Sequence, residues 1–142
     1  MRKPVQANDT FIQQINENLA VYQRFVKTIY ILDAFPKYPD GFLNRFLLDV
    51  LTRPEHLPYV HMNKRQVEKE MKHVKTRLAQ IDCTKCHFFD LSRVFLKDDK
   101  YLSFDEQTTT AYFDNSNHLT VPAVQLCEPV FEKLAQQVMN DF

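Results

Sequence analysis

Glycine is almost absent from this chain of 142 residues, in which Gly41 is the only one. Glycine-rich phosphate loops and dinucleotide-binding fingerprints need several glycines, so both are excluded. The Gly-x-Ser-x-Gly nucleophile elbow is excluded too, because no serine has a glycine neighbour. Serine itself is scarce and occurs only at Ser92, Ser103 and Ser116. The chain therefore offers few candidates for a serine nucleophile.

Long apolar runs and an excess of one charge are also lacking. No run approaches the ~18 to 20 apolar residues that span a bilayer, and the basic N-terminus is not followed by the apolar core of a signal peptide. The formal net charge of +0 indicates no attraction to nucleic acid or to an anionic membrane. Hydrophobic residues make up 44% of the chain, which suffices for one buried core at this length. Residues 1–7 are expected to be a disordered lead, and residues 8–142 to belong to a single domain.

Helix and strand patterns alternate along the chain. Two short runs rich in β-branched and aromatic residues, 28–32 and 87–91, predict strands, and the first is expected to be buried on both faces as in a parallel sheet. Apolar residues recur at helical spacing over residues 11–26, 42–51, 63–81 and 121–139. This order predicts an α/β fold with a three-layer arrangement around a parallel sheet. An intact domain of that kind needs more strands, and the missing ones are expected to be N-terminal.

The last of these helices is expected to be kinked at Pro129. Its periodicity predicts an inward face made of Val124, Leu126, Val130, Phe131, Leu134 and Val138.

Residues 112–120 contain the chemistry-bearing stretch Tyr-Phe-Asp-Asn-Ser-Asn-His-Leu-Thr. An apolar run ends in a polar turn that carries Asp114 and His118, and Thr120 is then a suitable N-cap for the last helix. A carboxylate beside an exposed imidazole is typical of a general-base pair, in which the acid orients the ring and the ring moves the proton. The sequence therefore gives Asp114 and His118 as candidate catalytic residues.

This stretch resembles the last conserved block of SGNH (GDSL-type) hydrolases. It is most similar to the SGNH domain at the C-terminus of membrane O-acyltransferases, in particular the nematode group related to the nose-resistant proteins. Residues 29–39, 83–92 and 127–131 resemble that group as well, and the likeness runs from about residue 8 to the C-terminus. The resemblance implies an SGNH-hydrolase-like fold of which this chain is the C-terminal portion, without the N-terminal strands and the nucleophile block.

The resemblance also implies a function. The chain would supply the Asp/His loop of a Ser-His-Asp site for acyl transfer or ester hydrolysis, with the serine outside this chain. The partners would be an acyl donor and acceptor, each a small molecule or lipid, and the membrane would be reached through an N-terminal transmembrane region that this chain lacks. The domain would be lumenal or extracellular, and no cofactor, metal or nucleic acid is implied. The alternative is a degenerate, non-catalytic SGNH-like domain.

The position of the acid departs from the family pattern. In SGNH enzymes the acid usually lies three residues before the histidine, and here that position is Asn115. Either Asp114 or Asn115 can therefore be the residue that contacts the ring of His118. Only a carboxylate stabilises an imidazolium by charge, so the choice decides whether the pair can be catalytic.

The cysteines allow several readings. Cys83, Cys86 and His87 form the Cys-x-x-Cys-His pattern of c-type haem attachment, but His87 opens a strand-like run rather than a helix. A thioredoxin-like pair would precede a helix, which is the reverse of the order here. A zinc site needs four ligands, and Cys127 with His87 gives no known spacing. The resemblance implies a disulfide on the secretory side of the membrane, while the sequence leaves its pairing open.

Two further groups of residues complete the candidates. Asp33 and Pro36 follow the first strand, at the edge where α/β sheets bind ligands. The remaining histidines have no motif around them and are expected to be exposed to solvent; they are His56, His61 and His73.

Overall fold

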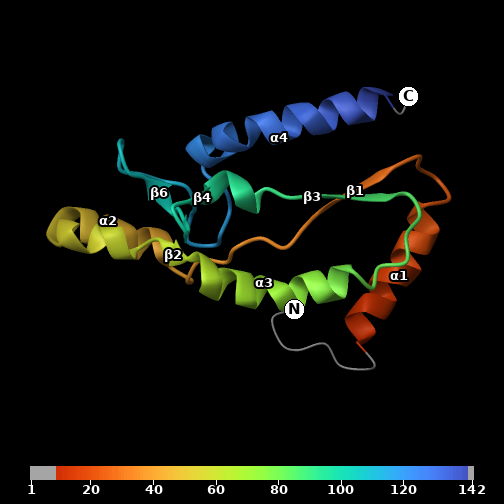
Figure 1. Ribbon diagram of the computed structural model, residues 1–142, viewed down its shortest axis with the longest axis horizontal. Helices are drawn as coiled ribbons and strands as arrows, with labels where there is room; N and C mark the ends of the chain where they lie inside the picture. The colour runs from red at the N-terminus through yellow and green to blue at the C-terminus, as the bar shows by residue number, and fades with distance from the viewer. Residues whose placement is uncertain (1–8, 141–142) are drawn as a thin grey trace.

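The computed structural model of the protein describes residues 9–140, and Figure 1 shows how their helices and strands are arranged. The expected disordered lead, residues 1–7, lies outside the described residues. The α-helices are α1 (Thr10–Tyr22), α2 (Phe42–Thr52), α3 (Lys64–Leu78) and α4 (Val121–Asn140). The strands are β1 (Ile29–Leu32), β2 (Met62–Asn63), β3 (Cys86–Phe89), β4 (Leu96–Lys97), β5 (Lys100–Tyr101), β6 (Phe104–Asp105) and β7 (Thr110–Ala111). Two 3-10 helices are η1 (Pro54–Tyr59) and η2 (Ser92–Phe95).

Strands β1 and β3 form a parallel pair, with Ile29 opposite Cys86 and Leu32 opposite Phe89. In the view of Figure 1, α4 runs along one side of this pair and α3 along the other. The predicted α/β class is therefore confirmed. The expectation that β1 is buried on both faces was wrong: its residues are only partly buried, and Leu32 is 41% exposed. Within the described residues the pair has no third strand, and Phe88 of β3 is 46% exposed.

The rest of the β-structure consists of short antiparallel pieces. Strand β5 lies between β2 and β4, while β6 and β7 form a separate hairpin. The turn between β4 and β5 has positive φ at both Asp98 and Asp99, the backbone that a tight two-residue hairpin requires. Strands of two residues are too short to produce a periodic pattern, which is why the sequence did not resolve them.

Aromatic side chains dominate the core. Phe113 is fully buried, and its ring stacks on that of Tyr38 with the centroids 4.1 Å apart. Phe95 contacts Phe113 at 5.2 Å between centroids, while Phe46 contacts Phe104 at 5.0 Å. These rings come from the loop after β1, from α2, from η2 and from both sides of the β6–β7 hairpin. The core therefore ties the segment before residue 114 to the segment that leads into α2.

Helix α4 has the predicted bounds but not the predicted inward face. Val124, Phe131 and Val138 are 45%, 39% and 36% exposed, whereas Ala123 and Cys127 are fully buried. These two small side chains lie one turn apart and let the helix backbone approach the core closely. The expectation was wrong for the exposed residues Val124, Leu126, Phe131 and Val138, whereas Val130 packs against the core as predicted. Pro129 lies inside the helix without ending it. Among the described residues, no helix combines the length and the apolar character needed to cross a membrane.

Candidate functional site

The acid–histidine loop, residues 114–118, is closed by the backbone on both sides. Phe113 and Leu119 form an isolated antiparallel bridge, and the N–H of Asp114 donates to the carbonyl of His118 at 3.0 Å. Asn117 adopts a left-handed conformation with φ of 65°, which asparagine tolerates better than most residues. This turn brings residue 118 back beside residue 114 despite the extra residue between them.

The carboxylate of Asp114 organises the loop. Its Oδ1 accepts hydrogen bonds from the backbone N–H of Ser116 at 2.7 Å and of His118 at 2.9 Å. Its Oδ2 lies 2.8 Å from Nδ1 of the His118 ring. The N–H of His118, followed by the ring and the N–H of Ser116, lowers the pKa of the Asp114 carboxyl. The group is therefore ionised throughout the neutral pH range and holds the ring by charge and geometry.

The side chain of Asn115 does not contact His118 but bonds to Asn44 of α2. Its side-chain NH₂ donates to Oδ1 of Asn44 at 3.1 Å, and its own Oδ1 accepts the N–H of Asn44 at 3.1 Å. The N–H of Gly41 donates to the Asn115 carbonyl, and the N–H of Tyr38 to Oδ1 of Asn117. These bonds attach the loop to the beginning of α2. Of the two alternatives that the sequence left open, Asp114 is the residue in contact with the ring.

His118 presents its second nitrogen to solvent. Its side chain is 78% exposed, and among the described residues none forms a hydrogen bond with Nε2. In a neutral ring whose Nδ1–H donates to Asp114, Nε2 carries the lone pair. Such a nitrogen can accept a proton from a hydroxyl group placed beside it.

No serine in the described residues is placed for that role. Ser92 and Ser103 are 2% and 0% exposed, so neither hydroxyl can reach a substrate. Ser116 is exposed, but the contact it makes with the pair is its backbone N–H on Asp114. The described chain thus brings acid and base together without a nucleophile.

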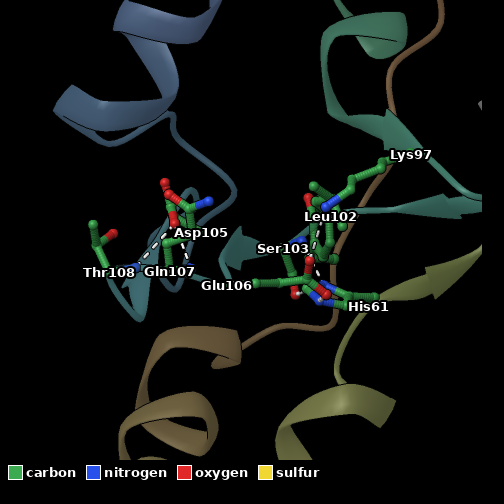
Figure 2. A network of polar contacts seen from close by, with 9 residues as sticks. His61, Lys97, Leu102, Ser103, Asp105, Glu106, Gln107 and Thr108 are labelled. Atoms are coloured by element: carbon green, nitrogen blue, oxygen red, sulfur yellow. Dashed lines mark hydrogen bonds and ion pairs between the residues drawn. The ribbon is translucent and has the colours of Figure 1, made fainter.

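The expectation that His61 is exposed was wrong. Figure 2 shows it in a polar network between Ser103 and Glu106, and its side chain is only 1% exposed. Its ring stacks on Phe104 with centroids 4.5 Å apart. Nδ1 accepts the backbone N–H of Ser103 at 3.2 Å and lies 3.2 Å from the hydroxyl of the same residue. The apolar neighbours Val60 and Met62 were the signal in the sequence that pointed to a buried position.

Serine, histidine and glutamate are the residue types of a catalytic triad, but Ser103, His61 and Glu106 do not have the hydrogen bonds of one. The lone pair of Nδ1 is already shared with the backbone N–H of Ser103, and the hydroxyl is fully buried. Nε2 lies 3.3 Å from Oε1 of Glu106. Burial lowers the pKa of His61 more than Glu106 raises it, so the ring is neutral at neutral pH. The network holds the β6–β7 hairpin to the segment before β2.

The cysteine pattern is a disulfide. Cys83 and Cys86 are bonded to each other, which confirms the expected disulfide and supplies the pairing that the sequence left open. Both sulfurs are thereby occupied and cannot form thioether bonds to a haem. Cys127, on the buried face of α4, is a free cysteine. Among the described residues, no group of histidine, cysteine and acidic side chains is arranged to hold a metal ion.

Asp33 and Pro36 do not join the acid–histidine loop. Oδ2 of Asp33 lies 3.2 Å from Nζ of Lys75, and its Oδ1 accepts the N–H of Ala34. Asp33 therefore links the end of β1 to α3, and Pro36 is buried.

A comparison with protein families gives a match over residues 2–133, to the family described as "SGNH domain (fused to AT3 domains)". Neither a curated protein nor a solved structure matches the chain. The family match covers nearly all of the sequence and includes both parallel strands, the disulfide and the acid–histidine loop. On this ground, and in agreement with its mixed α/β fold, the chain belongs to the family of SGNH domains that are fused to AT3 domains.

Proposed function

We propose that the chain is the C-terminal part of an SGNH-type O-acyltransferase or esterase domain, in which Asp114 and His118 serve a serine supplied from outside this chain. The observation that carries the proposal is the contact of 2.8 Å between Oδ2 of Asp114 and Nδ1 of His118, with Nε2 left open. The family description, which names fusion to AT3 domains, suggests acyl transfer and a membrane context. The resemblance of the sequence to the nematode acyltransferase group supports the same proposal.

The proposed reaction uses His118 twice. As the serine oxygen attacks the acyl carbonyl, its proton passes to Nε2 of His118, and the Asp114 carboxylate stabilises the imidazolium. When the first C–O bond breaks, the departing alcohol takes that proton from Nε2. The acceptor alcohol, or water in hydrolysis, then attacks the acyl-serine and gives its own proton to Nε2, from which the serine recovers it. Atoms and charges balance without a cofactor.

The exposure of His118 favours an active site that is completed by another segment over one that is already closed to solvent within this chain. An imidazole that is 78% exposed is accessible to a serine carried by another segment, and it lacks the dry surroundings in which oxyanion stabilisation is strongest. We infer that the serine-bearing segment also supplies the oxyanion donors. The disulfide agrees with an oxidising, lumenal or extracellular compartment.

The decisive experiment uses the full gene product, including whatever the transcript encodes before residue 1. A serine-directed fluorophosphonate probe should label a Gly-Asp/Asn-Ser block in that product. Labelling should fall by about 10³-fold or more in His118→Ala and Asp114→Ala, as expected when a triad loses its base or its acid. His73→Ala is the matched control, because it removes another histidine of the same chain far from the loop in sequence.

The second candidate is a non-catalytic SGNH-like domain, favoured by the absence of a placed serine among residues 9–140. A transcript with no serine block before residue 1, or labelling that His118→Ala leaves unchanged, would select this candidate.

A further inference from the structure

Helix α2 begins without a side-chain cap of its own. Its N-cap residue is Gly41, in a left-handed conformation with φ of 72°, and glycine has no side chain that could accept an N–H of the first turn. The N–H of Asn44, the third residue of the helix, is one that an N-cap side chain ordinarily accepts. Here it donates to Oδ1 of Asn115 at 3.1 Å, across a separation of 71 residues. The acid–histidine loop therefore caps α2.

The contact between Asn44 and Asn115 is reciprocal. Because Oδ1 of Asn115 accepts a backbone N–H, the orientation of its amide group is fixed and its Nδ2 is the donor. Nδ2 donates to Oδ1 of the Asn44 side chain at 3.1 Å, and the backbone carbonyl of Asn115 accepts the N–H of Gly41 at 3.3 Å. Three hydrogen bonds thus join one residue of the loop to the start of α2. An aspartate at position 115 could accept but not donate, so it would lose the bond to Oδ1 of Asn44.

The contacts that Asp114 makes with its side chain all lie within the loop. Its Oδ1 accepts from the N–H groups of Ser116 and His118, and its Oδ2 lies 2.8 Å from Nδ1 of His118. The His118 side chain is 78% exposed, so packing constrains its ring little. The geometry of the pair therefore depends on what fixes the loop to the rest of the domain. Asn115, directly after Asp114, makes the three bonds to α2.

We propose that Asn44 and Asn115 are positioning residues of the acid–histidine site, whose paired hydrogen bonds hold the loop on α2 in the form in which Asp114 accepts from Nδ1 of His118. Their importance for acyl transfer rests on the proposed function, but the hydrogen bond that they hold is observable without any reaction. A neutral imidazole keeps its hydrogen on Nδ1, and its lone pair on Nε2, while an acceptor is held beside Nδ1. When that acceptor moves away, the hydrogen can occupy either nitrogen.

The tautomer of His118 tests the proposal, read by ¹⁵N NMR on histidine-labelled residues 1–142 at a pH at which the ring is neutral. The His118→Ala variant identifies the signals. Asn44→Ala should lower the ratio of the Nδ1–H to the Nε2–H tautomer by about three- to tenfold, the factor that the loss of one hydrogen bond represents. Asn44→Asp keeps an acceptor for Asn115, at a helix N-terminus that favours negative charge, and should keep the native ratio. Asn18→Ala, at an exposed position of α1, is the matched control and should keep it too.

A double substitution tests whether Asn44 acts through Asn115. Asn115→Ala alone should lower the tautomer ratio at least as much as Asn44→Ala, and Asn44→Ala added to it should cause no further change. Because Asn44 is exposed, its substitution leaves the core intact, and a cooperative urea transition of each variant verifies that the ratio is measured on folded chain. The proposal is overturned if Asn44→Ala keeps the native ratio, if Asn44→Asp changes it as much as alanine does, or if the two alanine substitutions are additive.

Labelling of the full gene product with the fluorophosphonate probe separates this proposal from the proposed function. Asn44→Ala should reduce labelling by the same factor, about three- to tenfold, and Asn18→Ala should not reduce it. Labelling that even His118→Ala leaves unchanged would overturn acyl transfer through the pair, while the tautomer ratio would still decide the positioning role of Asn44.

Discussion

Phe113 stacks on Tyr38, with ring centroids 4.1 Å apart and planes 25° from parallel. Phe113 is the residue directly before Asp114, and Tyr38 belongs to the segment that leads into α2. The backbone N–H of Tyr38 also donates to the side chain of Asn117. The aromatic core thus fixes the residue directly before the acid–histidine loop, while hydrogen bonds of the Asn115 and Asn117 side chains fix the loop itself.

The first prediction concerns this support. Phe113→Ala should lower the free energy of unfolding by about 3–5 kcal/mol, because it removes a fully buried ring from a close-packed aromatic cluster. Urea denaturation of the chain measures the loss. Phe25→Ala is the control, since Phe25 is 79% exposed and its loss should change stability by no more than about 0.5 kcal/mol. Equal losses in the two variants would contradict the packing described above.

The second prediction is a pH dependence from Asp114. Its folded-state pKa lies below the ordinary value, so its contribution to stability is complete above the unfolded-state pKa near ~3.9 and disappears as the pH falls through the folded value. Urea midpoints of the native chain and of Asp114→Asn should therefore differ at pH 6 and converge toward pH 3. Asp40→Asn, at an exposed position outside the loop, serves as control. A difference that stays constant over this range would be evidence against the carboxylate contacts.

The third prediction concerns His61, whose protonation the folded state resists because the ring is buried. Burial lowers its folded-state pKa, so below about pH 6.5, the unfolded value, the unfolded chain binds a proton that the folded chain resists. Stability should therefore fall as the pH drops below 6.5 and level off once the folded ring is protonated. His61→Leu should remove this component between pH 7 and 5, whereas His73→Leu should keep it. Parallel urea titrations measure both, and identical slopes would exclude the buried position.

The fourth prediction is a thiol count. Under non-reducing conditions the native chain should react slowly with DTNB, because Cys127 is buried and the other two cysteines are bonded. In denaturant one thiol should react, and after reduction all three. Expression with a cytochrome c maturation system should give no Soret band, since a covalent chromophore needs both Cys83 and Cys86. Three reactive thiols without reduction would rule out the disulfide.

The fifth prediction is that residues 1–142 alone hydrolyse p-nitrophenyl acetate no faster than their own His118→Ala variant. The acid and base are paired, but neither of the buried serines nor Ser116 is placed beside Nε2. Turnover above the variant that disappears on substituting Ser92, Ser103 or Ser116 would contradict this prediction and relocate the nucleophile into the chain.

The sequence predicted what depends on local pattern. Periodicity and caps predicted the helix that begins at Phe42 and the helix that follows the N-cap Asn63. A β-branched run predicted the strand at Ile29, and a motif predicted the loop around His118. What failed depends on tertiary packing. The apolar residues of α4 gave no sign that Ala123 and Cys127 would be the contact face, because helical periodicity shows a stripe but not how closely a neighbour approaches.

The dependence on tertiary packing also explains which contacts of the candidate site the sequence could not predict. The contact of Asp114 with His118 follows from the left-handed turn at Asn117, a backbone state that a single sequence indicates only weakly. His61 was misjudged because its partners, Ser103 and Glu106, are more than one element away in the chain. Long-range pairs of this kind leave no mark on spacing.

The parallel pairing of Ile29 with Cys86 has a consequence for how the chain folds. Strands β1 and β3 are separated by α2, η1 and α3, so the pair forms only after a long segment has been brought back on itself, which costs chain entropy before any contact compensates. Helices α2 and α3 depend on local contacts and can form earlier. Closing Cys83 to Cys86 fixes the turn directly before β3 and reduces the disorder that this late step must remove. Oxidation should therefore accelerate the slowest phase of refolding, in addition to stabilising the product.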